Sequence, residues 1–330
     1  MMSKRAKSIS YKADHPSPAD GADKIYDVII IGAGFSGMSA ALTLGRACRS
    51  VLVVDDKPDL SDRRRIGGYL GFVGSLSEFR EAGRSQIADL ENVSWTHGTA
   101  QQFLPSDAFV EVRVGEEKYL GRNILIATGV RDVLPDIPGL QKIWGKWAFY
   151  CPHCHGWEHR DKPVAVVGPA SLSYQIAALL TSWTGKITIY THEESERIDW
   201  IPQIRLNNKK ILRLGTTESG VSIECADGTA ENYTAIYIPR QRVGNAHFAK
   251  ISGCAVDENG IVTTTSGQTN VPRIYATGEG AGRSIAALES AADGAQIGRL
   301  LTALLTKERI SHLANKKEYS QFASNKTPAK

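Results

Sequence analysis

Two segments of the chain repeat one pattern of apolar and polar positions. In the first, an apolar run from Tyr26 enters a glycine-rich turn, and a helical stretch at 38–47 and an apolar run ending at Asp55 follow. In the second, the apolar run starts at Pro163, a helix follows, and the next strand is predicted at 186–194. Strand, turn, helix and strand make a βαβ unit, so we predict two such units on parallel sheets.

Further apolar stretches complete the predicted core. A buried strand with a glycine turn is predicted at 123–129, a similar strand precedes Gly280, and a long amphipathic helix is predicted at 284–305. The ends of the chain are polar. We therefore expect a disordered arm at 1–24 and a polar tail at 311–330.

The composition of the 330 residues is that of a globular protein, with 42% hydrophobic and 22% charged residues. It excludes collagen-like, coiled-coil and largely disordered chains, and no apolar run reaches the roughly 18–20 residues that span a membrane. The net charge of +4 comes from the two ends, which carry +2 and +4, while the body between them carries −2. We therefore predict neither a nucleic-acid partner nor a membrane partner.

The five cysteines are too few and too scattered for a secreted disulfide framework. The basic start of the chain is not followed by the apolar core of a signal peptide, so we expect a cytoplasmic protein. Cys48, Cys225 and Cys254 stand singly, which is typical of packing residues.

The first glycine-rich turn has the form of a dinucleotide-binding site. It matches G-x-G-x-x-G between a strand and a helix, and Asp55 ends the next strand, where a carboxylate can accept hydrogen bonds from a ribose. Gly32 makes the tight turn, Gly34 allows a pyrophosphate to approach, and Gly37 allows the helix to pack on the strand. The N-terminus of that helix favours phosphate. The residues assigned to the cofactor here are Gly32, Gly34, Phe35, Ser36, Gly37 and Asp55.

The sequence Cys-Pro-His-Cys-His at 151–155 carries the second candidate chemistry. A C-x-x-C pair can close a small disulfide, and a first cysteine at a helix start has a stabilised thiolate, which thiol–disulfide exchange needs. Pro152 suits a first helical turn. The cluster could instead be half of a zinc site with His153 or His155, or two inert cysteines. No second ligand pair with suitable spacing exists, and we predict no metal.

Four motifs in this order resemble the low-molecular-weight thioredoxin reductase family. They are the glycine motif at 32–37, the ATG turn at 127–129, the cysteine pair and the ATGEG sequence at 276–280. The resemblance implies an α/β flavoprotein with two doubly wound, Rossmann-like dinucleotide-binding domains, FAD as the cofactor, and a homodimer. It also implies a split FAD-binding domain at 25–137 and 242–310, interrupted by a disulfide domain at 138–241.

The same resemblance assigns roles to individual residues. Cys154 is expected to face the flavin as the charge-transfer thiolate, while Cys151 exchanges with substrate. His155 stands where the family usually has Asp, and its ordinary pKa near 6.5 suits general acid–base work. Glu279 stands where the family usually has the Asp that holds the ribityl chain. The further residues expected at the flavin are Thr128, Gly129, Gly278, Glu279 and Ala287.

The second glycine turn departs from the family's NADPH-binding motif. Ala170 replaces the second glycine, and its Cβ opposes the approach of a pyrophosphate. Glu193 and Glu194 stand at the end of the next strand, where an arginine cluster would bind a 2′-phosphate. Ile285 and Ala286 replace the Arg-Gln pair that often precedes the flavin-contacting residue. These departures argue against NADPH and resemble three branches of the family: gliotoxin- and holomycin-type dithiol oxidases, ferredoxin-linked reductases and diflavin-linked disulfide oxidoreductases.

The function that this resemblance predicts is FAD-dependent oxidation of dithiols. A substrate thiolate attacks the disulfide at Cys151, a second substrate thiol resolves the mixed disulfide, and electrons pass through Cys154 and FAD to oxygen or another acceptor. The expected substrate is a small dithiol or a protein disulfide or dithiol. Two alternatives stay open: a thioredoxin or protein-disulfide reductase fed by ferredoxin or NAD(P)H, and a flavin-bearing redox sensor.

Overall fold

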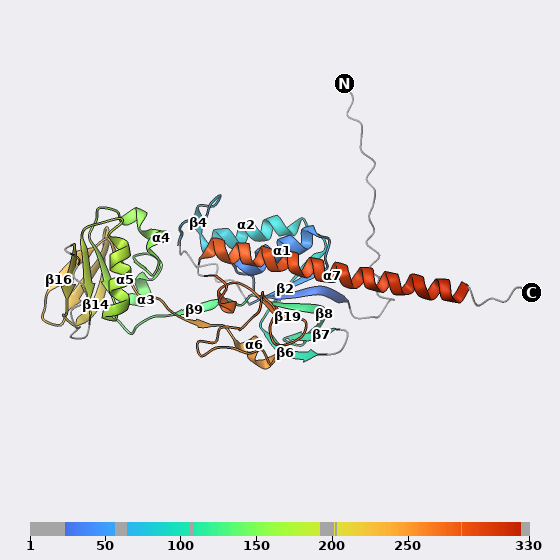
Figure 1. The fold of residues 1–330 in the computed structure, drawn as a ribbon. Helices are drawn as coiled ribbons and strands as arrows, with labels where there is room; N and C mark the ends of the chain where they lie inside the picture. Colours follow the sequence, from blue (N-terminus) through green and yellow to red (C-terminus); the bar gives the residue numbers. More distant parts are fainter. Residues whose placement is uncertain are drawn as a thin grey trace, which may run out of the picture.

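The computed structural model describes residues 24–56, 65–105, 109–191, 201, 203–284 and 286–324. Figure 1 shows two lobes joined by narrow strands, with a long C-terminal helix that runs along one lobe and projects beyond it. Several features of the sequence analysis lie outside the described residues: the arm at 1–23, the acidic pair Glu193 and Glu194, and Ile285.

Short strands make up much of the regular structure. The strands are β1 (Ile25–Ile31), β2 (Val51–Asp55), β3 (Arg65–Ile66), β4 (Gly74–Ser75), β5 (Val93–His97), β6 (Ala100–Pro105), β7 (Val110–Val114), β8 (Glu117–Ile126), β9 (Val130–Val133), β10 (Ala148–Phe149), β11 (Val164–Val167), β12 (Ile187–Tyr190), β13 (Ile204–Asn207), β14 (Ile211–Thr217), β15 (Gly220–Cys225), β16 (Ala230–Tyr233), β17 (Ala235–Tyr237), β18 (Gln241–Gly244) and β19 (Ile274–Ala276). The helices are α1 (Phe35–Arg46), α2 (Leu76–Ala88), α3 (Leu140–Ile143), α4 (Pro152–His155), α5 (Ala170–Leu180), α6 (His247–Ile251) and α7 (Ala287–Ser324), with short 3-10 turns η1 (Trp157–His159) and η2 (Glu279–Ala281).

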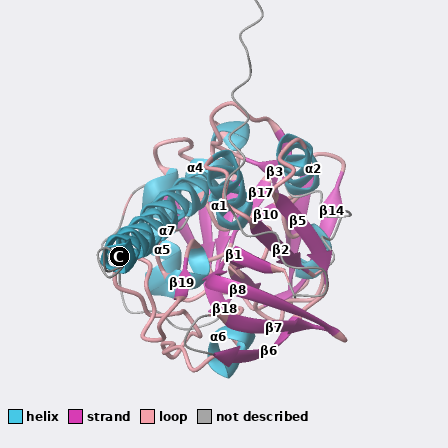
Figure 2. Cartoon of the chain, turned by 90° about the vertical axis from the view of Figure 1, so that its right-hand side faces the viewer, coloured by secondary structure: helices cyan, strands magenta, loops and turns pink. Residues whose placement is uncertain are grey.

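The first lobe is built on a seven-stranded sheet in the order β5-β2-β1-β8-β7-β6, with β19 paired to β8. β5, β2, β1, β8 and β19 run parallel, and β7 and β6 continue the sheet antiparallel. Ile29 and Ile31 enter the core on one face, and Val28 and Ile30 enter the core on the other. Because α1, α2 and α7 cover one face and α6 lies on the other (Figure 1, Figure 2), the central strand is apolar on both sides.

Helix α7 crosses α1 through small residues. A Cβ at Gly294 would overlap the backbone carbonyl of Ser36, and one at Gly298 would lie 3.1 Å from the Cβ of Thr43. Only glycine allows the two backbones to approach this closely at position 294. The crossing therefore holds the N-terminal turn of α1 directly against α7.

The C-terminal helix is longer than the sequence predicts. The amphipathic pattern ends at Leu305, whereas α7 continues to Ser324, into the segment expected to be a polar tail. The side chains from Thr306 to Ala314 are exposed, so packing does not explain the extension. Residues 306–324 contain no Gly or Pro and many residues of high helix propensity, which favours continuation of the helix. Nowhere in the described ranges is a helix both long and apolar enough to cross a membrane.

The second lobe contains a five-stranded parallel sheet in the order β10-β17-β11-β12-β13 and a three-stranded antiparallel sheet, β14-β15-β16. The predicted second βαβ unit is present as β11, α5 and β12. The chain crosses between the lobes twice, and the crossing strands β9 and β18 pair antiparallel (Figure 1).

Candidate active site

A cavity of about 1270 Å³ is lined by residues of both lobes. It exceeds the roughly 300–1,000 Å³ of an ordinary small-molecule pocket, which suits a ligand as long as a dinucleotide. Its walls include the first glycine turn, the ends of β2 and β8, the start of α7, and helix α4. The predicted site residues that line it are Gly32, Gly34, Phe35, Ser36, Asp55, Thr128, Gly129, Cys151, Cys154, His155, Glu279 and Ala287.

The first glycine turn has the open backbone that a pyrophosphate needs. A Cβ at Gly34 would meet no atom within 4 Å, so the missing side chain leaves space at the cavity wall. Gly32 has a φ of +105°, and a Cβ there would come within 2.5 Å of the carbonyl oxygen of Ala127. Because Gly34 is the N-cap of α1, no side chain occupies the first N–H groups of that helix, which leaves them for a ligand.

Gly37 and Gly278 lie behind the cavity and are not among the residues that line it. A Cβ at Gly37 would overlap the carbonyl oxygen of Gly32, so Gly37 has the packing role that the sequence predicts. A Cβ at Gly278 would lie 2.6 Å from the hydroxyl oxygen of Ser36. The sequence predicts a cofactor contact at Gly278, but the structure places this residue against α1, where it supports the turn.

Asp55 ends β2 at the cavity wall. Its Oδ1 accepts a hydrogen bond from the backbone N of Ala33 at 3.2 Å, and its Oδ2 accepts one from Nη2 of Arg84 at 2.9 Å. The residue is 7% exposed, so these partners fix the carboxylate between the glycine turn and α2. Arg80 on α2 also lines the cavity, and its buried Nε finds no partner in the described part of the chain. An unpaired buried donor at a cavity wall fits an anionic ligand.

Asp293, which the sequence analysis does not single out, holds the last turn in place. Its Oδ2 accepts hydrogen bonds from the hydroxyl of Thr277 at 2.6 Å and from the backbone N of Gly278 at 2.8 Å. Its Oδ1 accepts a third from Nε of Arg283 at 2.7 Å. A carboxylate flanked by the small residues Ala292 and Gly294 in an amphipathic helix was the available signal, because a buried charge needs partners.

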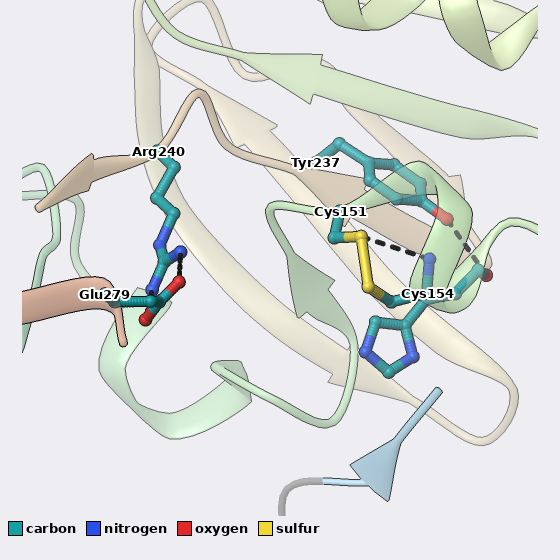
Figure 3. The surroundings of a disulfide bond; sticks show 6 residues. Cys151, Cys154, Tyr237, Arg240 and Glu279 are labelled. Atoms are coloured by element: carbon teal, nitrogen blue, oxygen red, sulfur yellow. Dashed lines mark hydrogen bonds and ion pairs between the residues drawn. A yellow bond between two sulfur atoms is a disulfide. The ribbon is translucent and has the colours of Figure 1, made fainter. Parts of the chain in front are cut away.

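The carboxylate of Glu279 lines the cavity but is bound by Arg240. The two terminal nitrogens of Arg240 donate to Glu279 at 2.6 and 3.2 Å, and its Nε donates to Asp132 at 2.8 Å. Its guanidinium also lies 4.1 Å from the ring centroid of Tyr150. Burial lowers the pKa of Arg240, but the hydrogen bond that it donates to Glu279 and its other partners outweigh this effect, so the net shift is upward. Figure 3 shows Arg240 and Glu279 facing each other beside the cysteine pair.

Cys151 and Cys154 form a disulfide. Cys151 is the N-cap of α4, and its Sγ accepts a hydrogen bond from the backbone N of Cys154 at 3.1 Å. Pro152 occupies the start of the helix, as the sequence predicts. An N–H directed at Sγ favours the thiolate of Cys151 once the disulfide opens. Over the described residues, no group of three or more His, Cys, Asp or Glu side chains is arranged to hold a metal ion.

Gly67 of the first lobe lies against the backbone carbonyl of Cys154. A Cβ at this position would overlap the carbonyl oxygen of Cys154, so any other residue would push the turn away. Gly67 and Gly68 both line the cavity. Their role was not predicted, because nothing near this glycine pair in the sequence indicates which residue it contacts.

His155 is half-buried and stacks on Phe149, with ring centroids 4.1 Å apart. The pKa of His155 is lowered to about 4, mainly by burial; the charge of Glu158 opposes this shift, and those of His159 and Arg65 add to it. The ordinary pKa near 6.5 that the sequence suggests is therefore wrong for the disulfide form, because burial penalises the imidazolium. His155 is neutral at physiological pH in this form and can accept a proton.

The second glycine turn differs from the first at the atoms that would meet a phosphate. Pro169 caps α5 and has no N–H, whereas the corresponding Ala33 donates its N–H to Asp55. Ala170 is the first residue of α5 and carries a Cβ where the first turn has Gly34. The second turn thus lacks the N–H that ties the first turn to Asp55, and it lacks the open approach at Gly34.

The chain is similar to known proteins both in sequence and in structure. Residues 26–295 match the family described as pyridine nucleotide-disulphide oxidoreductase. The chain is 30% identical over 283 residues to thioredoxin reductase tcpT of Claviceps purpurea, which covers 77% of this chain and 86% of that protein. It is 27% identical over 290 residues to thioredoxin reductase sirT of Leptosphaeria maculans, with coverage of 77% and 86%. The solved structure of HlmI is similar with a TM-score of 0.79 and 26% identity, over 89% of this chain and 97% of that one.

These matches confirm the predicted α/β fold of Rossmann-like dinucleotide-binding domains. Members of the matched family are FAD-binding flavoproteins. The cavity fits this cofactor, since Gly34 leaves its wall open, Arg80 offers an unpaired donor and Asp55 presents a fixed carboxylate. The protein thus belongs to the pyridine nucleotide-disulphide oxidoreductase family and is an FAD-binding oxidoreductase.

Proposed function

We propose that this protein oxidises dithiols to disulfides at the Cys151–Cys154 pair. The observation that carries the proposal is that the disulfide and the glycine turns around Gly34 and Gly129 line one cavity. FAD bound in this cavity would supply a two-electron acceptor for the cysteine pair, with dioxygen or another oxidant as the final acceptor.

The exchange begins when a substrate thiolate attacks Sγ of Cys151, which breaks the disulfide and releases the thiolate of Cys154. The second substrate thiolate then attacks the substrate sulfur of the mixed disulfide and releases Cys151. The substrate loses two electrons and two protons, and the cysteine pair gains the two electrons. The N–H of Cys154 directed at Cys151 Sγ supports Cys151 as the exchanging sulfur, because it stabilises the Cys151 thiolate that leaves in the second step.

His155 is the proposed proton acceptor. With a pKa of about 4 it is neutral while the disulfide is closed, so it can take a proton from a substrate thiol. Opening of the disulfide creates a thiolate in the same helical turn, and a nearby negative charge favours the imidazolium. The pKa of His155 therefore rises when its proton arrives.

The second glycine turn supports oxidation over NADPH-driven reduction. Ala170 places a Cβ where a pyrophosphate would need an open approach. Reduction of a protein disulfide is the second candidate, because the relatives from Claviceps purpurea and Leptosphaeria maculans are named thioredoxin reductases. Such a reductase would need another donor, such as ferredoxin.

Turnover under air tests this function. The FAD-loaded protein is incubated with excess dithiothreitol, and oxygen uptake, peroxide and oxidised dithiothreitol are measured. We expect catalytic formation of one disulfide for each peroxide, and none with Cys151→Ser. Failure to oxidise dithiothreitol, together with NADPH consumption when a protein disulfide is added, would replace the oxidase with a reductase.

The resemblance also leads us to propose a homodimer. Light scattering of the FAD-loaded protein is expected to give twice the mass of one chain. The mass of a single chain would overturn this assignment.

A further inference from the structure

A partly buried charge cluster lies where the chain returns to the first lobe, and the proposed exchange chemistry does not use it. Arg240 immediately precedes the crossing strand β18. Its side chain is 16% exposed, and those of its ion-pair partners Asp132 and Glu279 are 11% and 19% exposed. All three line the cavity, as does Tyr150.

The partners of Arg240 belong to three separate segments. Asp132 lies on the other crossing strand, β9, and Glu279 begins η2 after β19. Tyr150 directly precedes Cys151. One guanidinium therefore connects the two crossings of the chain, the last cavity turn and the residue next to the disulfide.

The contacts of Arg240 require the shape of a guanidinium as well as its charge. Its planar fork donates two hydrogen bonds to Glu279 and a third to Asp132, while its face lies over Tyr150. A lysine ammonium is a point charge. It can neither form a bidentate pair with a carboxylate nor stack on an aromatic ring. Arg242, whose Nη1 lies 3.7 Å from Glu279, is too distant to replace these bonds.

We propose that Arg240 is a positioning residue that holds the Cys151–Cys154 disulfide at the cavity wall opposite the cofactor turns. This inference rests on the proposed function, because it concerns the same disulfide and the same cofactor site. Arg240 fixes Tyr150 at the start of the cysteine turn, and Gly67 receives the carbonyl of Cys154 at its end. Arg240 in turn pairs with Glu279 of the first lobe (Figure 3), so the contacts at both ends of the turn lead to the first lobe.

Two rates measured on the same FAD-loaded protein test this role. Disulfide opening by dithiothreitol is followed by acid quench, alkylation and mass spectrometry, and cofactor reduction is followed by the flavin absorbance. In Arg240→Lys we expect unchanged disulfide opening, because exchange at Cys151 needs only access for the thiol. Flavin bleaching should slow by about 10- to 100-fold, since a displacement of about 1 Å between reacting groups has effects of this size.

Two further variants separate positioning from general stability. Tyr150→Ala should reproduce the slow bleaching of Arg240→Lys, and the double variant should be no slower than either single one. Arg213→Lys is the matched control, because Arg213 makes a bidentate pair with Glu224 on the exposed β14–β15 hairpin. Both rates should remain unchanged in this control.

Small-angle X-ray scattering provides a readout that does not depend on catalysis. Loss of the cluster in Arg240→Ala should increase the radius of gyration, while Arg213→Ala should leave it unchanged. If dithiols do not bleach the wild-type flavin at all, the proposed function fails, and an unchanged radius in Arg240→Ala overturns the positioning role as well. If wild-type bleaching is rapid and Arg240→Lys alters neither rate, the positioning role is overturned while the proposed function stands.

Discussion

The sulfur atom of Cys154 is needed for electron transfer to the cofactor but not for the reaction of Cys151 with a thiol. Cys154→Ser leaves Cys151 able to react with a thiol but removes the sulfur that would pass electrons onward. We expect dithiol-driven bleaching of the flavin to be abolished, as measured by anaerobic absorbance. Cys48→Ser is the control, because Cys48 is a free, exposed cysteine outside the cavity, and its bleaching rate should match wild type. Wild-type bleaching in Cys154→Ser would refute its role.

His155 should make the stability of the protein depend on pH, because its pKa of about 4 lies below the ordinary value of 6.5. The unfolded chain therefore takes up a proton at His155 at a higher pH than the folded chain does. The free energy of unfolding should fall as pH drops from 6.5 towards 4, by up to about 3 kcal/mol from this residue. Denaturant unfolding at pH 7 and 4.5 should show a smaller loss in His155→Gln. An equal loss in both proteins would contradict the shift.

Residues that act through short motifs were predictable, and those that act through distant partners were not. Gly34 and Cys151 carry their chemistry within a few positions of sequence, so their neighbours define them. Arg240 contacts Asp132 across 108 residues, and no local pattern links the two. The role of Gly67 likewise depends on the fold, which brings it against Cys154. The pKa of His155 was missed for the same reason, because burial is a property of the fold.

At the scale of elements, the crossing of α1 and α7 supports the cofactor turn. Gly294→Ala would place a methyl group against the carbonyl of Ser36, and we expect a loss of about 1–3 kcal/mol in the free energy of unfolding. FAD affinity should fall too, because Ser36 lines the cavity. Thermal unfolding and flavin fluorescence measure the two effects.

Gly298→Ala is the matched control on the same helix. Its new methyl group would meet the side chain of Thr43 at 3.1 Å, and the higher helix propensity of alanine, worth about 1 kcal/mol, offsets this tight contact. We therefore expect a nearly neutral change. Equal losses in the two variants would show that backbone contact at Gly294 does not matter.

The apolar pattern predicted most elements because buried parallel strands are apolar on both faces, as residues 28–31 of β1 illustrate. It failed at the end of α7, because residues 306–314 remain helical without burying side chains. Helix propensity governs such a stretch, and hydrophobic periodicity does not report it.

At the scale of the molecule, the two repeated units have diverged in what they can bind. The first keeps Gly34 and the N–H of Ala33, while the second has Ala170 and Pro169 at these positions. The sequence revealed the change at Ala170, whereas the contrast at Pro169 became evident only from the bond between Ala33 and Asp55. The cavity shared by the two lobes could not be predicted from motifs, since it depends on how β9 and β18 place the cysteine turn.

Anaerobic titration of the FAD-loaded protein, followed at the flavin absorbance, tests whether dithiols rather than NADPH reduce the flavin. Dithiothreitol and NADPH are added to separate samples in small steps. We expect dithiothreitol to bleach the flavin and NADPH not to, because Ala170 of the second glycine turn closes the approach that a pyrophosphate needs. Rapid bleaching by NADPH, with no response to dithiothreitol, would contradict it.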